Sequence, residues 1–213
     1  MTFGIKYFLV NGRLQVIRMN NLAKLFETQK LLDNRIVDEH NLHGQDLLPQ
    51  KILALQVELG ELCQNWRGFK FWSKDQAPRT FEWFGKCEEC DGYGDDENSS
   101  CPDCAGTGVG HCNPLLEEYV DGLHFILSIG NDLGVDLNKC EIEAFKNDTI
   151  LDQFNLLFYV IGDLKEVKNK VSLIIIMEYY LGLGGLLGFS WEQITDAYYA
   201  KNAINHTRQD NKY

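Results

Sequence analysis

Apolar side chains recur at helical spacing along most of this chain, whereas the strict alternation of a strand is scarce. Positions i, i+3, i+4 and i+7 share one face of a helix, so segments with this spacing predict amphipathic helices. We therefore predict an all-α fold, a helical bundle. The predicted helices span about residues 22–33, 49–62, 114–125, 150–165, 171–189 and 190–207.

Capping residues set the starts of several predicted helices. Asparagine, serine and an early proline favour a helix start, because they satisfy or remove N–H groups that have no partner in the first turn. Ser190 and Gln193, three residues apart, form the pattern of a capping box. The starts predicted in this way lie at Asn20–Asn21, Pro49, Asn113–Pro114 and Ser190.

Two of the predicted helices carry a pair of carboxylates three residues apart on an otherwise apolar stripe. The pairs are Glu58 with Glu61 and Glu118 with Asp121. A charged carboxylate on a core-facing stripe is costly unless something compensates the charge. Four carboxylates that converge in one interior need shared protons or metal ions, and oxygen ligands without histidine or cysteine suit Mg²⁺ or Mn²⁺. The competing interpretation is two solvated helix faces with incidental acidic residues, and the pattern favours the metal site.

The composition is that of a globular protein of one domain. The chain has 213 residues, of which 45% are hydrophobic, and it carries a formal net charge of −11. This acidity opposes nucleic-acid binding, because contacts with the phosphate backbone need clustered lysine and arginine. It does not oppose a small anionic substrate delivered with Mg²⁺, because the metal supplies the local positive charge.

Two apolar segments raise the question of export or membrane insertion. Residues 1–18 have no basic start and no small-residue cleavage site, so we expect one short strand or an N-terminal extension rather than a signal peptide. Residues 171–189 are long and apolar enough to suggest a membrane span. Glu178 at the centre of that segment and the glycines after it favour a buried core helix that ends at the glycines. We therefore expect a cytoplasmic protein that binds no membrane.

Residues 75–113 break the helical pattern, since they are polar and rich in glycine and cysteine. We predict that this segment is an insertion between two core helices. It contains a duplicated C-x-x-C-x-G-x-G motif, in which two residues between thiolates let both sulfurs reach one ion. Two such motifs predict one tetrahedral Zn²⁺ site, which is closed and therefore structural. The predicted zinc ligands are Cys87, Cys90, Cys101 and Cys104.

His111 and Cys112 follow the second motif and are alternative ligands. We favour loop roles for both, because four better-spaced thiolates already fill the site. The cysteine motifs resemble the zinc domain of DnaJ-type chaperones over about 25 residues, and this likeness carries no function with it. The acidic residues of the insertion argue against a nucleic-acid partner, whereas a protein partner remains open.

The two acid pairs resemble the signature of a known superfamily. Glu58-Leu-Gly-Glu61 and Glu118-Tyr-Val-Asp121 match the E-x-x-E and E-x-x-D motifs of the all-α nucleoside triphosphate pyrophosphatases, which include MazG-type enzymes and dimeric dUTPases. The surrounding residues favour the dimeric dUTPases in their bacterial and phage form, over about residues 20–74 and 114–213. The insertion widens the usual spacing of the motifs, but it can bulge outward without moving the carboxylates. The further matching blocks are Leu25-Phe-Glu-Thr-Gln29 with Asp33, Asn65-Trp-Arg-Gly-Phe-Lys-Phe-Trp72, Asp121-Gly-Leu-His-Phe125 and Tyr199-Ala-Lys-Asn-Ala-Ile-Asn-His-Thr-Arg-Gln209.

This resemblance implies an enzyme, a homodimer that hydrolyses dUTP to dUMP and pyrophosphate. It implies that Glu58, Glu61, Glu118 and Asp121 ligate two or more Mg²⁺ ions. The metal ions would neutralise the triphosphate and lower the pKa of a water that attacks the α-phosphate. Glu58 or Glu61 would accept the proton from that water, and the sequence does not choose between them.

The resemblance also implies a set of substrate-binding residues. Gln29 and Asp33 are expected near the base and sugar, because a side-chain amide can pair with a uracil edge. Basic and amide residues of the last helix recur on one surface that suits phosphate oxygens. Most of these residues also have a purely structural interpretation. Lys70 would be a solvated lysine, Trp72 and Phe125 core aromatics, and His124 a hydrogen-bonded core histidine. The residues of the last helix would belong to an exposed terminal helix. The implied set is Gln29, Asp33, Lys70, Trp72, His124, Phe125, Lys201, Asn202, Asn205 and Arg208.

The sequence thus predicts an N-terminal extension (1–18), a catalytic domain in two segments (19–74 and 114–213) and a zinc-binding insertion (75–113). Two other functions remain open. If the chain keeps the four metal-binding acids but has a different base pocket, it would be a MazG-like pyrophosphatase with another or broader nucleotide preference. Alternatively, the chain is chiefly a regulatory module whose zinc insertion binds a protein. The acid pairs favour the enzyme, because a pure adaptor has no reason to maintain four inward carboxylates.

Overall fold

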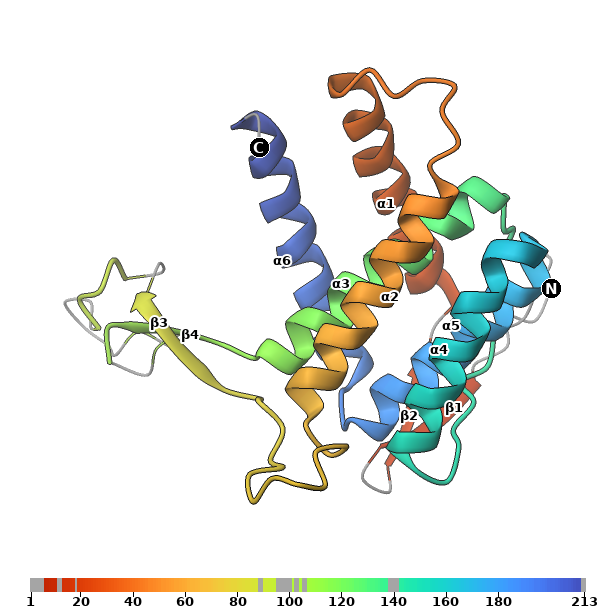
Figure 1. Cartoon of the computed structure of the whole chain (residues 1–213). Helices are drawn as coiled ribbons and strands as arrows, with labels where there is room; N and C mark the ends of the chain where they lie inside the picture. The colour runs from red at the N-terminus through yellow and green to blue at the C-terminus, as the bar shows by residue number, and fades with distance from the viewer. Residues whose placement is uncertain are drawn as a thin grey trace.

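The computed structural model of the protein describes residues 6–10, 13–17, 19–87, 90–94, 101, 104, 107–137 and 142–211. Over these residues the chain forms a helical bundle with little sheet, so the predicted all-α fold is confirmed (Figure 1). The helices are α1 (Met19–Glu39), α2 (Leu48–Trp66), α3 (Pro114–Leu133), α4 (Ile150–Val167), α5 (Lys170–Leu186) and α6 (Trp191–Asp210). The strands are β1 (Lys6–Val10), β2 (Arg13–Ile17), β3 (Glu82–Lys86) and β4 (Val109–Cys112).

The predicted helix starts agree closely with the structure where a capping side chain defines them. The Asn113 side chain accepts a hydrogen bond from the Leu116 N–H at 3.1 Å, with Pro114 at the first helical position. Ser190 and Gln193 make both bonds of a capping box. The first helix is longer than predicted, since α1 runs to Glu39 and its last turn is held by an Arg35–Glu39 ion pair.

The N-terminal segment forms an antiparallel pair of strands rather than one strand. Lys6 pairs with Ile17 and Val10 with Arg13. β1 lies against α5, and β2 lies against α6. The apolar start of the chain therefore folds onto the bundle instead of extending away from it.

The centre of the bundle is α3, which packs against α1, α2, α5 and α6. Tyr119 on α3 and Tyr180 on α5 stack with ring centroids 4.7 Å apart. Each hydroxyl donates to the other residue's carbonyl oxygen, at 3.1 and 2.8 Å. These two buried bonds fix the register of α5 on α3.

The helix of the apolar run, α5, ends at Leu186, within the glycine cluster where the sequence predicts its end, with Gly182, Gly184 and Gly185 inside the helix and Gly188 after it. Gly184 lies where a Cβ atom would come within 2.6 Å of the Tyr119 hydroxyl, and Gly122 on α3 faces the Tyr180 hydroxyl in the same way. The glycines therefore permit close helix packing, and the turn comes later, at Gly188 with φ +89°. No single helix among the described residues is long and apolar enough to cross a membrane, although α5 and α6 satisfy that test as a pair bent by 110°.

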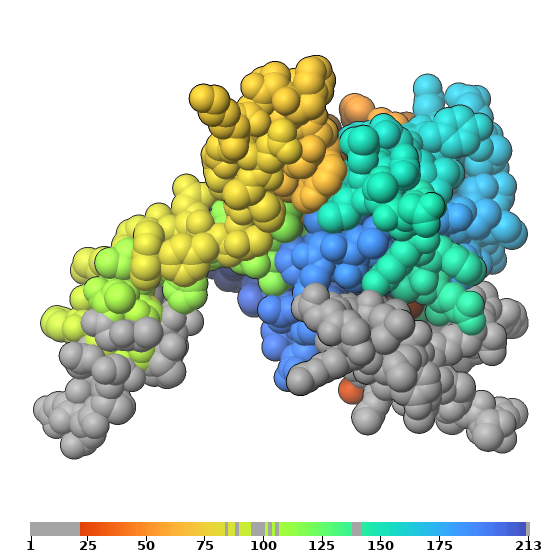
Figure 2. Space-filling view, turned by 90° about the horizontal axis from the view of Figure 1, so that it is seen from below, coloured from red at the N-terminus to blue at the C-terminus, as the bar shows by residue number. Residues whose placement is uncertain are grey.

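The segment between α2 and α3 leaves the bundle as an arm that carries β3 and β4 (Figures 1 and 2). The two strands are antiparallel, with Trp83 opposite His111. The root of the arm is anchored at both helices, since Arg79 N–H donates to the Asn65 carbonyl and Leu115 N–H donates to the Arg79 carbonyl, each at 2.9 Å. The arm thus projects outward and leaves α2 and α3 packed side by side.

Candidate active site

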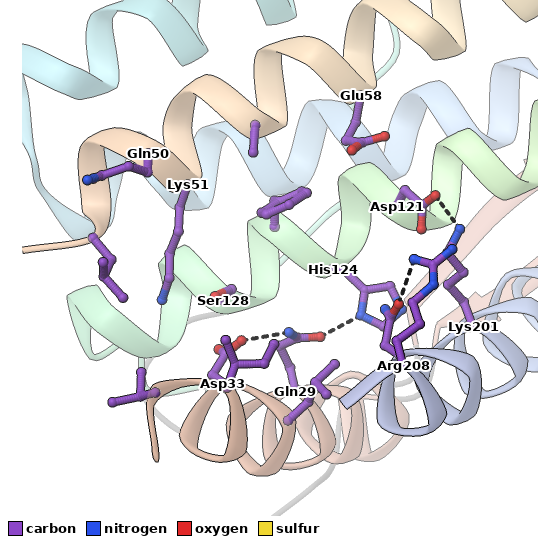
Figure 3. A pocket seen from close by; sticks show the side chains of 17 residues that line it. Gln29, Asp33, Gln50, Lys51, Glu58, Asp121, His124, Ser128, Lys201 and Arg208 are labelled. Atoms are coloured by element: carbon purple, nitrogen blue, oxygen red, sulfur yellow. Dashed lines mark hydrogen bonds and ion pairs between the residues drawn. The ribbon is translucent and has the colours of Figure 1, made fainter. Parts of the chain in front are cut away.

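A cavity of about 420 Å³ lies between α1, α2, α3 and α6 (Figure 3). All four helices contribute polar or charged side chains to its wall, and apolar residues fill the rest. The polar and charged lining residues are Gln29, Asp33, Gln50, Lys51, Glu58, Asp121, His124, Ser128, Lys201, Asn205 and Arg208. The cavity therefore offers charged groups of both signs to one small molecule.

Three of the four predicted acidic ligands converge at one end of this cavity, where Glu58 and Asp121 line the wall and Glu118 lies beside them. Carboxylate oxygens of Glu58, Glu118 and Asp121 lie within 4.8 Å of one another. They meet because α2 and α3 pack along their lengths and each carries its acids one turn apart. Glu61 is exposed and lies outside this group of three. The structure thus brings together a triad of carboxylates and leaves the fourth beside it.

Burial and mutual repulsion make these carboxylates unusually basic. Burial, and then the charges of Asp121 and Glu61, raise the pKa of Glu58 to about 7. Burial and the same cluster of negative charges raise the pKa of Glu118 to about 7. Burial also raises the pKa of Asp121, although a hydrogen bond from Lys201 opposes that shift. A cation bound between the three would relieve this repulsion.

The last helix supplies positive charge to the acidic end. Lys201 Nζ lies 2.6 Å from Asp121 Oδ2, with side chains that are 21% and 19% exposed (Figure 3). Arg208 donates to Asn205 Oδ1 at 3.2 Å, and its charge lowers the pKa of Asp121. Lys201, Asn205 and Arg208 therefore form one polar stripe of α6 that faces the cavity.

A hydrogen-bonded chain forms the cavity wall away from the acids. Gln29 Nε2 donates to Asp33 Oδ1 at 2.8 Å, and Gln29 Oε1 lies 2.6 Å from His124 Nδ1. The Tyr198 hydroxyl donates to the same Gln29 oxygen at 2.9 Å, and its ring stacks on His124 at 4.2 Å between centroids. Burial, and then the Lys201 charge, lower the pKa of His124 to about 3, so this imidazole is neutral. These contacts join α1, α3 and α6 at the candidate base and sugar site.

Phe125 also lines the cavity, whereas the predicted substrate residues Lys70, Trp72 and Asn202 do not. Trp72 lies in the segment after α2, is 66% exposed and packs edge-on against Phe69 and Phe71. The neighbouring Lys70 ammonium lies 5.6 Å from the centre of the Phe69 ring. Asn202 is buried next to the stripe of α6 but is not among the lining residues. Their substrate roles stay predictions.

Sequence reasoning missed four polar residues of the cavity region. Gln50, Lys51 and Ser128 line the cavity, and Lys51 pairs with Asp132 at 2.6 Å. Tyr198 holds Gln29 and His124 in place. Helical spacing was the available signal, because Tyr198 lies one turn before Lys201 and Ser128 lies one turn after His124.

The four predicted zinc ligands also come together, on the arm. The four cysteine sulfur atoms lie within 4.8 Å of one another. The Gly94 N–H donates to Cys90 Sγ, and the Gly108 N–H donates to Cys104 Sγ. Burial opposes ionisation, but the Gly108 N–H and the neighbouring thiols outweigh it and lower the pKa of Cys104 to about 7. His111 instead stacks on Phe81 outside the cluster. The cluster is formed by Cys87, Cys90, Cys101 and Cys104.

The bundle and its cavity define an all-α protein with an interior acidic triad suited to a divalent cation and an anionic ligand. The family model described as dUTPase matches residues 21–84 and 109–213, so the chain belongs to the all-α dimeric dUTPase family. No curated protein matches the chain. Membership makes the protein a hydrolase of dUTP, a dUTP diphosphatase of nucleotide metabolism. The match omits residues 85–108, which contain the four cysteines of the cluster.

Proposed function

We propose that the protein hydrolyses dUTP to dUMP and pyrophosphate in a Mg²⁺-dependent reaction within the cavity between α1, α2, α3 and α6. The observation that carries this proposal is the convergence of Glu58, Glu118 and Asp121 at one end of a cavity with a polar chain along its wall, in a chain of the dUTPase family. The acidic end suits the triphosphate with its metal. The Gln29–His124 wall suits the deoxyuridine.

The residues at the acidic end fit Mg²⁺. Hard oxygen ligands without histidine or cysteine suit this ion, and burial and mutual repulsion raise the pKa values of Glu58 and Glu118, which a bound cation would relieve. Glu58, Glu118 and Asp121 would hold the metal, with Glu61 as a further ligand at the rim. When bound, two or more Mg²⁺ ions neutralise the triphosphate and lower the pKa of the attacking water.

The protein's own side chains then bind and orient the nucleotide. Lys201 and Arg208 neutralise phosphate oxygens, and the Asn205 amide donates to them. Gln29, Asp33 and the Phe125 ring face the base, while the neutral His124 contacts the sugar. Glu58 lines the cavity and Glu61 does not, so Glu58 is the better placed to accept the proton of the attacking water.

A pyrophosphate-release assay with dUTP, dCTP, dTTP and UTP, each with Mg²⁺ and with EDTA, tests this function. Turnover confined to dUTP and dependent on Mg²⁺ is the expected result. Comparable turnover of several nucleotides would instead identify a broader, MazG-like pyrophosphatase. Absence of turnover from folded protein would refute both enzymatic functions.

We further propose that the protein acts as a homodimer, which the family membership supports. The apolar segment of α5 is mostly internal, since Leu173, Ile176 and Tyr180 are fully buried within one chain. Exposed apolar side chains on α2 and α4, such as Leu53 and Tyr159, are better suited to an interface. Light scattering with size-exclusion chromatography measures the mass directly, and a value near 24.4 kDa would exclude the dimer.

We also propose that the arm, within residues 75–113, binds one structural Zn²⁺. The four sulfurs suit a tetrahedral site without an open position, and N–H donors stabilise thiolates. The zinc content of purified protein, measured by mass spectrometry of the metal, is expected to be one per chain. It should fall to zero in Cys87→Ser/Cys101→Ser.

Protein binding by the arm is a second candidate function. Phe81 and Trp83 are 51% and 53% exposed, and with His111 they form an aromatic cluster on one face of the strand pair. None of the three lines the cavity, so this exposed cluster is available to a protein partner. Loss of turnover in Glu61→Gln with retained binding of a protein partner would separate this role from catalysis.

A further inference from the structure

We propose that Lys201 is an internal counterion, which holds the acidic triad while metal is absent and moves to the triphosphate when metal and nucleotide bind. Lys201 would thereby couple the binding of the metal to the binding of the nucleotide. This inference rests on the proposed function, because it requires both ligands to bind in this cavity.

The first observation is the direct contact between the ammonium and a candidate metal ligand. Lys201 Nζ lies 2.6 Å from Asp121 Oδ2, and both side chains are largely buried. Asp121 in turn lies within 4.8 Å of Glu58 and Glu118. A single lysine therefore supplies positive charge to three clustered carboxylates, as a metal ion would.

The second observation concerns the other cations of the cavity. Arg208 donates to Asn205 Oδ1 at 3.2 Å, and its charge lowers the pKa of Asp121. Lys51 pairs with Asp132 at 2.6 Å. Lys201 thus pairs with a carboxylate of the triad at 2.6 Å, whereas Lys51 pairs with a carboxylate outside it.

Lys201 and a divalent ion compete for the triad. Both need the same Asp121 carboxylate, and two cations at such short range repel each other. The flexible four-carbon stem of lysine lets the ammonium leave without a backbone movement. Metal that binds alone must therefore displace Lys201 from a partly buried partner, which weakens metal binding.

The nucleotide provides a new partner for the displaced ammonium. Lys201 shares its face of α6 with Asn205 and Arg208, and all three line the cavity. A triphosphate bound there replaces Asp121 as the counterion of Lys201. Binding of either ligand requires that Lys201 separate from Asp121. Once one ligand has bound, the other no longer meets the cost of that separation, so each raises the affinity of the other by the same factor.

The test measures metal affinity without turnover. Mn²⁺ binding is followed by electron paramagnetic resonance, with and without a dUTP analogue that carries nitrogen between the α and β phosphorus atoms. In Lys201→Met, Mn²⁺ alone should bind about tenfold more tightly than in the wild type, and the enhancement by the analogue should shrink by a similar factor. Lys201→Arg keeps the charge and should resemble the wild type.

Lys51→Met is the matched control, because it removes one positive charge from the same cavity at a different partner, Asp132. It should change Mn²⁺ affinity far less than Lys201→Met. Unchanged or weaker Mn²⁺ binding in folded Lys201→Met would overturn the inference, as would a tightening of equal size in Lys201→Arg. If the wild type binds no Mn²⁺ even with the analogue, the proposed metal-dependent function itself fails.

Discussion

The two candidate metal sites of this protein are built in opposite ways. The carboxylate triad lies on α2 and α3, whose positions are fixed by a large apolar core that needs no metal. In the described part of the arm, by contrast, the buried cluster consists of the cysteines themselves. The comparison teaches that one metal site can form on a fold that is stable without the metal, whereas another can supply the core that its segment otherwise lacks.

The largest expected effect is on catalysis at the triad. Glu58→Gln should lower kcat/KM for dUTP by at least about 10²- to 10³-fold, because it removes a charge at the metal and at the reacting water. The fold should survive, since the neutral side chain relieves repulsion in the triad. Steady-state pyrophosphate release and circular dichroism measure the two effects. Glu166→Gln, at an exposed position of α4, is the control and should leave turnover unchanged.

Zinc removal should act on the arm and spare the bundle. Structural Zn²⁺ sites contribute on the order of 10 kcal/mol of binding free energy, and the described arm has no other buried cluster to replace it. A strong chelator should therefore abolish hydrogen-exchange protection in β3 and β4 while α2 and α3 stay protected. Equal loss of hydrogen-exchange protection in α2 and α3 would show that the stability of the bundle also depends on the zinc ion.

A smaller effect is expected from pH on the metal-free protein. Burial and neighbouring charges raise the pKa of Glu58 and Glu118 from 4.5 to about 7 in the folded state. The folded protein therefore binds these protons more tightly than the unfolded chain, and stability should fall as pH rises from about 4.5 through about 7. Thermal unfolding with EDTA should show this fall. Glu118→Gln should flatten it, and an unaltered slope in that variant would show that other groups are responsible.

The smallest effect is expected at Trp72, in the exposed segment between the bundle and the arm. Trp72→Ala should change the free energy of unfolding by no more than about 0.5 kcal/mol, because the side chain is 66% exposed. The KM for dUTP should rise by no more than about threefold, because Trp72 does not line the cavity. A much larger rise with unchanged stability would show that Trp72 contacts the nucleotide after all.

Local chemistry explains which structural predictions succeeded. Asn113 and the Ser190–Gln193 pair fix helix starts through bonds within four residues, so the sequence predicts them well. Gly184 of α5 also admits the Tyr119 hydroxyl from another helix, since a Cβ atom there would lie within 2.6 Å of that oxygen. No local pattern records such a contact.

The same distinction applies to the sites. The amino-acid sequence by itself determined the acid pairs, their common face and the two cysteine motifs, since helical period and ligand spacing are properties of neighbouring residues. Only the tertiary structure decided that Glu61 lies outside the triad, that Tyr198 orders Gln29 and His124, and that Lys201 pairs with Asp121. These relations join helices that are distant in the chain, and their geometry follows from how the helices pack against one another.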